Sequence, residues 1–167
     1  KRHTLAFYEY GLLYHQGVGI DADVVRELER RSGMTFSTSV LARARIWKDL
    51  ESGNLDMTVS GISTPEREKF AWFIPYFSMK NYVLTSKTSV RILKPQDFLD
   101  HSSWIFGAVA SFRHGNLQDN FLENLRDLRR VEEAPEAVTL FQKLKAGRIQ
   151  GMFSQPPVYR YYLRELD

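Results

Sequence analysis

The alternation of apolar and polar positions divides the first half of the chain into strands and helices that follow one another in turn. Short apolar or β-branched runs predict three strands, at residues 4–7, at residues 35–40 and in the run that begins at Leu55. Apolar residues at helical spacing predict two helices between them, at residues 21–31 and 44–52. This β-α-β-α-β order indicates a parallel sheet with helices on its faces.

The same alternation starts again in the second half of the chain. Strands are predicted at residues 81–85, 104–109, 130–132 and 149–153, and helices at 117–128, 135–147 and 158–166. Residues 47–57 and 141–152 also echo each other, since each segment ends an amphipathic helix at a glycine and enters a strand. Such units are common in α/β folds, but together with the repeated pattern they favour two sequential α/β lobes, residues 1–86 and 87–167.

The third predicted strand ends in small hydroxyl residues, and a helix start follows it. Thr64 and Pro65 are typical of an N-cap and a first helical position, so we expect a helix to begin there. Arg67 would then lie in the first turn, where a cation opposes the helix dipole. An anion held by Ser60, Ser63, backbone N–H groups and Arg67 would explain this placement. The alternative is that Thr64 only caps a helix and Arg67 is a surface charge.

Composition narrows the classes of function. With 43% hydrophobic and 26% charged residues, the 167-residue chain is typical of a globular protein. The net charge is +3 and the pI about 9.2, yet basic and acidic residues are interspersed, so we expect no nucleic-acid partner. The chain has no cysteine and four isolated histidines, and neither a phosphate-binding glycine loop nor a nucleophile elbow. We therefore expect no metal, no cofactor and no catalytic residue.

Six segments, in order along the chain, carry a family resemblance: residues 19–25, 47–56, 60–67, 73–77, 144–149 and 157–158. The third of these reads Ser-Gly-Ile-Ser-Thr-Pro-Glu-Arg. With these segments the chain resembles the family 3 extracellular solute-binding proteins, which have the type II periplasmic-binding-protein fold and deliver amino acids and related solutes to ABC transporters. The resemblance implies an α/β, two-lobed fold in which each lobe is a mainly parallel sheet flanked by helices.

The resemblance also implies where a ligand would bind. In the family, an arginine matching Arg67 clamps the ligand carboxylate, and groups matching Ser60, Gly61 and Ser63 complete that grip. The second lobe then closes over the ligand with the loop that holds Ser111, Phe112 and Arg113. From the residues themselves, the tyrosines of the loop after the first strand, Tyr8, Tyr10 and Tyr14, could stack on a ligand or cover the edge of a core.

Several departures from the family pattern affect the expected ligand. The segment from Gly61 to Arg67 is one residue shorter than usual, so the register of Ser63 is open. Gln155 stands where the family places the aspartate that accepts the ligand's ammonium group, and Arg43 where many members place an aromatic residue. We therefore expect a small carboxylate or an acidic amino acid, unless Arg43 or Arg45 points to solvent.

Three functions follow from the resemblance. The first is a periplasmic or extracellular protein that binds an amino acid or organic acid and presents it to a membrane permease of an ABC transporter. The second is the ligand-sensing domain of a receptor kinase or cyclase. The third is a dehydratase-like enzyme, for which only Glu9 and His114 are candidate acids or bases. After the last predicted helix no strand returns to the first lobe, so we expect a shortened or minimal second lobe.

Overall fold

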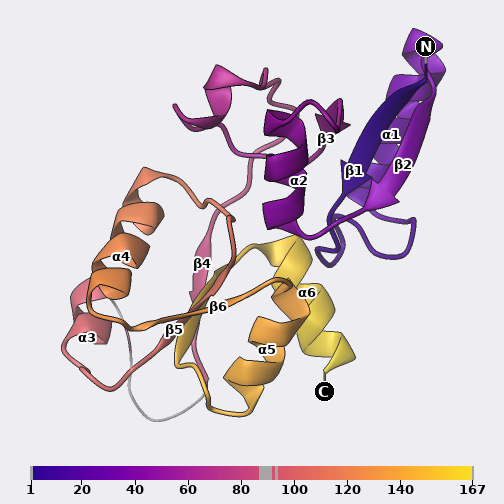
Figure 1. Ribbon diagram of the computed structural model, residues 1–167. Coiled ribbons are helices and arrows are strands. Elements are labelled where there is room, and N and C mark those ends of the chain that lie inside the picture. Colours follow the sequence, from indigo (N-terminus) through magenta and orange to yellow (C-terminus); the bar gives the residue numbers. More distant parts are fainter. Residues whose placement is uncertain (1, 87–91, 93, 167) are drawn as a thin grey trace.

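A first α/β lobe contains the N-terminal part of the chain. The computed structural model describes residues 2–86, 92 and 94–166. The elements of the first lobe are β1 (His3–Phe7), α1 (Ile20–Ser32), β2 (Phe36–Val40), α2 (Arg43–Glu51) and β3 (Met57–Thr58). The strands form a parallel sheet in the order β2-β1-β3, with Ala6 paired to both Ser39 and Thr58 (Figure 1). The predicted β-α-β-α-β lobe is therefore confirmed.

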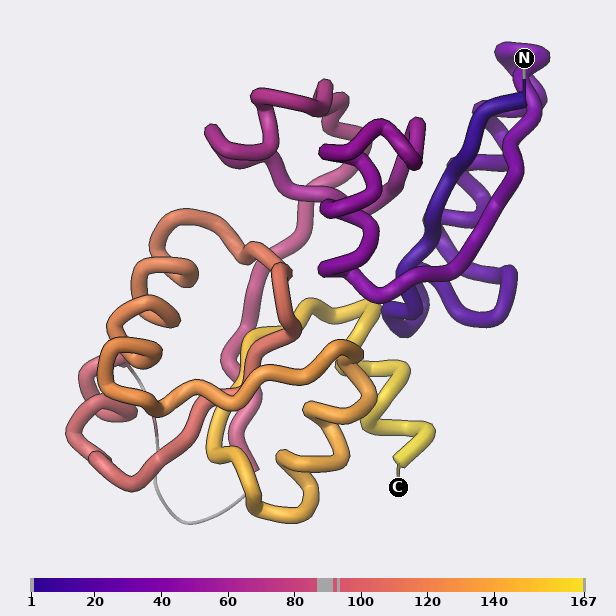
Figure 2. Tube along the Cα trace, in the orientation of Figure 1, coloured from indigo at the N-terminus to yellow at the C-terminus, as the bar shows by residue number. Residues whose placement is uncertain are grey.

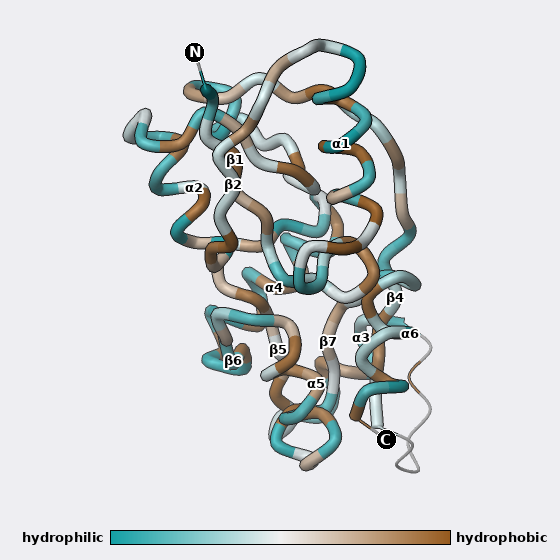
Figure 3. The backbone as a smooth tube through the Cα atoms, turned by 90° about the vertical axis from the view of Figure 1, so that its right-hand side faces the viewer, coloured by the Kyte–Doolittle hydropathy of each residue, from teal (hydrophilic) through white to brown (hydrophobic). Residues whose placement is uncertain are grey.

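Helix α1 shows why the sequence pattern identified its bounds well. Ala22 and Val25 are buried on one face, and two aspartates lie in the first turn, where they favour the helix dipole. Gly33 adopts a left-handed conformation (φ 69°) and its N–H donates to the carbonyl of Glu29, which ends the helix. In Figure 3, hydrophobic and hydrophilic stretches alternate along the helices, as expected for helices that cover a sheet.

A second lobe follows the same α/β plan. Its elements are β4 (Tyr82–Leu84), α3 (Pro95–Leu99), β5 (Phe106–Val109), α4 (Asn116–Asp127), β6 (Val131–Ala134), α5 (Ala137–Lys145), β7 (Gly151–Ser154) and α6 (Pro156–Glu165). The strand order is β4-β7-β5-β6, with β4 antiparallel to β7 and the other pairs parallel. Because β4 pairs with β7, residues 82–84 belong to the second sheet, although the boundary expected from sequence lies after residue 86.

One local expectation was wrong, and one helix was missed. The helix expected from Pro65 is only a single 3-10 turn, Arg67–Lys69, although the hydroxyl of Thr64 does accept a hydrogen bond from the N–H of Arg67. Helix α3 was not expected, because five residues are too few to show a helical period. After β7 the described chain enters α6 and forms no further strand.

Beside a hydrophobic cluster of its own in each lobe, one cluster contains residues of both lobes. The loop after β1 contributes Tyr8, Tyr10 and Leu13 to a buried cluster that also contains Val158 and Tyr162 of α6. The N–H of Leu12 donates to the carbonyl of Pro157 over 3.0 Å. Figures 1 and 2 show this loop against the start of α6. The lobes are therefore packed together, and the predicted two-lobed α/β fold class is confirmed.

No helix in the described part of the chain has the length and apolar character needed to cross a lipid bilayer.

Candidate functional site

A cavity of about 320 Å³ lies between the two lobes. The first lobe supplies residues 60–63 and the segment 73–79 that follows the 3-10 turn. The second lobe supplies Phe112, His114 and Gln155. Four of the residues expected from sequence at a ligand site, Ser60, Gly61, Ser63 and Phe112, thus meet Gln155 in one cavity wall.

A buried carboxylate holds one wall of this cavity in place. Asp21, at the start of α1, is only 2% exposed and accepts hydrogen bonds from the hydroxyls of Ser60 (2.7 Å) and Tyr76 (2.8 Å). The N–H of Ser60 donates to the oxygen of Tyr76 over 2.7 Å. Burial raises the pKa of Asp21, and these hydrogen bonds oppose that rise. The Ser60 hydroxyl, expected to bind a ligand anion, is here bound to Asp21.

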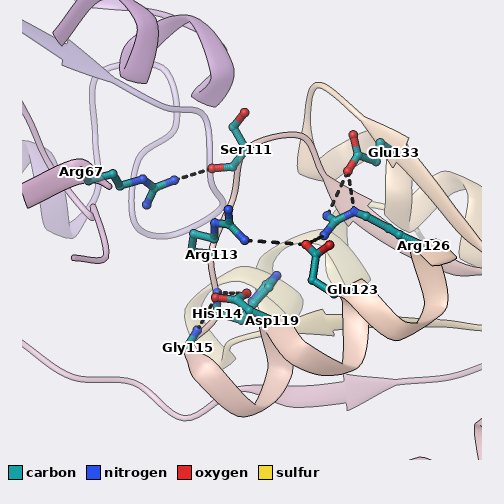
Figure 4. Close-up of polar contacts among 9 residues, drawn as sticks. All are labelled: Arg67, Ser111, Arg113, His114, Gly115, Asp119, Glu123, Arg126 and Glu133. Carbon is teal, nitrogen blue, oxygen red and sulfur yellow. Dashed lines mark hydrogen bonds and ion pairs between the residues drawn. The ribbon is translucent and has the colours of Figure 1, made fainter. Parts of the chain in front are cut away.

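Arg67 reaches from the first lobe to the second (Figure 4). Its guanidinium donates to the carbonyl of Ile62 over 2.9 Å and to that of Ser111, on the second-lobe loop, over 2.6 Å. It also stacks on Trp47, 3.7 Å from the ring centroid. Burial and the nearby charges of Arg43 and Arg113 lower the pKa of Arg67 to about 10, so it stays charged at neutral pH. Within the described residues Arg67 forms no ion pair.

Arg43 is a second buried cation near this point. Only 2% exposed, it donates to the carbonyl of Val59 over 3.2 Å, and its Nε has no hydrogen-bond partner among the residues that the structure describes. Its guanidinium lies 4.7 Å from the centroid of Tyr8. Desolvation lowers the pKa of Arg43. Arg43 therefore does not point to solvent. Arg45 does: it is exposed and paired with Asp49.

The three arginines expected at the site surround one small hollow beside the cavity. Arg43, Arg67 and Arg113 line it together with Ser60, Gly61, Ile62 and Phe112, which adjoin the cavity as well. Arg113 is the most exposed of the three, and one of its nitrogens lies 3.9 Å from Glu123, toward which it turns in Figure 4. Gly61 is required here, because a Cβ at this position would lie 2.9 Å from the Trp47 ring.

A chain of amide and hydroxyl groups forms the polar end of the cavity. Tyr10 donates to Oε1 of Gln155 over 2.7 Å, and Nε2 of Gln155 donates to Oδ1 of Asn81 over 2.5 Å. Asn81 in turn donates to the backbone carbonyl of His114 over 2.7 Å. Burial lowers the pKa of His114 to about 4, so its ring is neutral at neutral pH. Asn81 was missed from sequence, because no local motif marks a contact with a residue 74 positions away.

Some expected residues lie elsewhere. Tyr14 stacks on Phe7, 4.2 Å between centroids, inside the core of the first lobe. Tyr8 is buried beneath Arg43, and its hydroxyl has no hydrogen-bond partner in the described part of the chain. Ser63 does line the cavity, but its hydroxyl donates to Glu68. Their expected contacts with ligand stay predictions.

The candidate acids and bases do not form a catalytic pair. Glu9 binds His15 over 3.0 Å and is not part of the cavity wall, whereas His114 is in that wall. Within the described residues, no three histidine or acidic side chains are grouped to hold a metal ion.

Comparisons with known proteins agree with this architecture. An ancestral arginine-binding protein bound to arginine superposes with a TM-score of 0.80 at 20% identity, over 98% of this chain and 75% of that one. The arginine-, lysine-, histidine-binding protein ArtJ from Geobacillus stearothermophilus gives 0.80 at 19%, over 99% and 71%. A histidine kinase sensor domain with similarity to periplasmic binding proteins also gives 0.80, at 14%, over 99% and 73%.

A search of curated proteins finds no match. Residues 6–150 match the family described as bacterial extracellular solute-binding proteins, family 3. That match covers most of the chain, and the solved structures share its two-lobed fold. The chain therefore belongs to the bacterial extracellular solute-binding proteins of family 3.

Proposed function

We propose that this protein binds a small carboxylate-bearing solute, an amino acid or related organic acid, between its lobes. We further propose that it does so in the periplasm or outside the cell and presents the solute to the permease of an ABC transporter. The observation that carries the proposal is Arg67, a buried guanidinium in the interlobe hollow whose hydrogen-bond partners are two backbone carbonyls.

The chemistry of Arg67 favours a carboxylate. A guanidinium presents two parallel N–H donors that match the two oxygens of a carboxylate, and such charge-assisted pairs are strong. A buried cation without a counter-ion is unfavourable, so an anion brought into the hollow stabilises it. The Ser111 carbonyl now accepts from the Nη2 of Arg67, and a carboxylate bound at both guanidinium arms would replace it.

Arg43 strengthens the preference for an anion. It places a second buried positive charge beside Arg67, and no acidic side chain lines the cavity as described. Two of the similar structures are of arginine-binding proteins, whose ligand is a cation. The cavity of this chain offers no counter-charge to the cationic side chain of an arginine ligand. We therefore expect organic acids and acidic amino acids to bind better than arginine.

A thermal-shift screen against amino acids, dicarboxylates and 2-oxo acids tests this function, since a ligand that binds only the folded state raises the unfolding temperature. We expect Arg67→Ala to weaken binding of any hit by at least about 30-fold, because a charge-assisted pair is lost. Arg67→Lys keeps the positive charge but lacks the two parallel N–H donors, so it should weaken ligand binding less than Arg67→Ala does. Arg45→Ala, on the exposed face of α2, is the matched control.

Two results would contradict the proposal. One is a hit whose affinity is unchanged in Arg67→Ala. The other is a preference for lysine or arginine over organic acids.

A sensor function has specific support of its own. The histidine kinase sensor domain superposes as well as the two arginine-binding proteins do, with the same TM-score of 0.80. Because both functions use the same fold, ligand binding does not separate them. The flanking gene sequence does: a membrane-spanning segment fused to a kinase or cyclase supports sensing, and a gene encoding a permease beside it supports transport.

A further inference from the structure

The polar end of the cavity has spare hydrogen-bond donors. Oε1 of Gln155 already accepts from Tyr10, and one N–H of its amide donates to Asn81. One N–H of the Asn81 amide donates to the carbonyl of His114. Each amide nitrogen carries two N–H groups. In the described part of the chain, the second N–H of each amide has no partner, and both residues line the cavity.

The same end of the cavity lacks a negative charge. Asp21 is engaged by Ser60 and Tyr76, and Asp119 accepts hydrogen bonds from the backbone N–H groups of His114 and Gly115. Neither aspartate is part of the cavity wall. An ammonium group has three donors, carries a charge and accepts nothing, so it needs acceptors and a counter-charge to leave water.

The rest of the wall is largely apolar. Phe73, Phe77 and Met79 come from the segment after the 3-10 turn, and Phe112 faces them from the second lobe. A volume of about 320 Å³ is at the lower end of the range for small-molecule sites. The wall therefore suits a ligand with a compact apolar body.

We infer that Gln155 and Asn81 determine specificity, and that the site takes an apolar 2-oxo acid in preference to the α-amino acid of the same skeleton. This inference rests on the proposed function, with the carboxylate on Arg67. The cavity and the arginine hollow share Ser60, Gly61, Ile62 and Phe112 and so adjoin, but the hollow is only about 10 Å³. A ligand in the cavity would reach Arg67 by displacing the Ser111 carbonyl. The oxo oxygen accepts from the free amide N–H groups, whereas an ammonium in its place meets donors.

Isothermal titration of matched pairs tests the inference. The pairs are 4-methyl-2-oxopentanoate with leucine, and phenylpyruvate with phenylalanine, titrated into the full chain. We expect the better oxo acid to bind at least about tenfold more tightly than its amino acid, which corresponds to one unmatched buried polar group. Equal affinity, or tighter binding of the amino acid, overturns the inference.

A charge substitution supplies a gain-of-function test. Gln155→Glu keeps the shape and the hydrogen bond from Tyr10 and adds the missing carboxylate. We expect the preference to shift toward the amino acid by at least about tenfold. Gln142→Glu, on the exposed face of α5, makes the same change outside the cavity and should leave the preference unaltered. Asn81→Asp is a second route to the same charge if Gln155→Glu folds poorly.

Failure of the inference and of the proposed function are distinguishable. Tight binding of leucine or phenylalanine that depends on Arg67 overturns the inference alone. If no member of either pair binds, and no other carboxylate does, both are overturned. An unchanged preference in both charge variants removes the specificity role of the amides while leaving Arg67 in place.

Discussion

Burial sets the protonation of single side chains around the cavity. His114 packs between Phe112 and Phe153, with ring centroids 4.8 and 5.2 Å away. Desolvation disfavours its charged form and lowers its pKa to about 4. Arg67 experiences the same effect, yet its pKa of about 10 leaves it charged. The cavity wall thus contains a neutral imidazole, and the adjoining hollow a charged guanidinium.

The shifted pKa of His114 predicts a dependence of stability on pH. Between its ordinary value of 6.5 and about 4, the unfolded chain binds a proton at His114 that the folded chain does not. The free energy of unfolding should therefore be highest above this window and fall as the pH decreases through it, by at most about 2 kcal/mol between pH 6.5 and about pH 5. Urea unfolding at about pH 7.5 and about pH 5 measures the fall.

Comparison of variants isolates this contribution from other titrating groups. His114→Gln should reduce the pH dependence, whereas His3→Gln, whose side chain is 35% exposed, should keep it. The same slope in wild type and His114→Gln would show that His114 is not responsible.

At the scale of elements, one arginine organises the start of the second lobe. Arg130, just before β6, is 6% exposed and donates to four carbonyls: those of Phe98 and Leu99 at the end of α3, and those of His101 and Trp104 in the segment that follows. The last carbonyls of a helix have no partner within it, and a cation there also favours the helix dipole. Arg130 therefore fixes the short helix α3 against the sheet.

Arg130→Lys should lower the free energy of unfolding by about 2 kcal/mol, because a single ammonium cannot reach four carbonyls in the plane of a guanidinium. Chemical denaturation measures the change. Arg129→Lys, at the exposed neighbouring position, is the control and should stay within about 0.5 kcal/mol of wild type. Equal effects at the two positions would contradict this role.

The elements that sequence predicted well are those with a long local pattern. Helices α1, α4 and α5 each bury a regular apolar face, and their bounds agree with the spacing of those residues. The helix expected from Pro65 shows the limit of local signals. Its cap is present, but the chain leaves the helical path after Lys69, where Phe73 packs on Trp47 instead.

The candidate site, too, was predictable from sequence only where local motifs mark it. The end of the third predicted strand marked Gly61 and Arg67 as a candidate anion site, and the family resemblance implied that the second-lobe loop with Phe112 faces them. It could not show that Ser60 binds Asp21, 39 residues away, or that Asn81 joins Gln155, because these contacts depend on how the lobes pack. Their discovery required the tertiary structure.

At the scale of the whole molecule, the loop after β1 joins the lobes. Gly11 adopts φ 60°, and a Cβ there would lie 2.9 Å from the Cα of Val158. The backbone of the first lobe thus approaches α6 as closely as a glycine allows. This contact belongs to the shared core of the two lobes.

Gly11→Ala should separate the loop from α6 and lower the free energy of unfolding. Gly17→Ala is a close control, because Gly17 also has a positive φ of 87° but nothing within 4 Å of its added Cβ. Both variants carry the strain of a left-handed alanine, about 1 kcal/mol, and only Gly11→Ala adds the clash. We expect Gly11→Ala to lower the free energy of unfolding by about 1–3 kcal/mol more than Gly17→Ala does. Equal losses would mean that the clash is relieved without cost.

The hydrogen bond from Arg67 to the Ser111 carbonyl has a consequence for measured affinity. Within the proposed function, that carbonyl is an internal competitor, because it takes the guanidinium arm that a solute carboxylate would need. If the carboxylate needs the N–H that the carbonyl takes, only molecules in which the bond is broken are competent to bind, so the apparent dissociation constant is the intrinsic one divided by their fraction. With one molecule in ten competent, the protein would bind its solute about tenfold more weakly than the site itself allows.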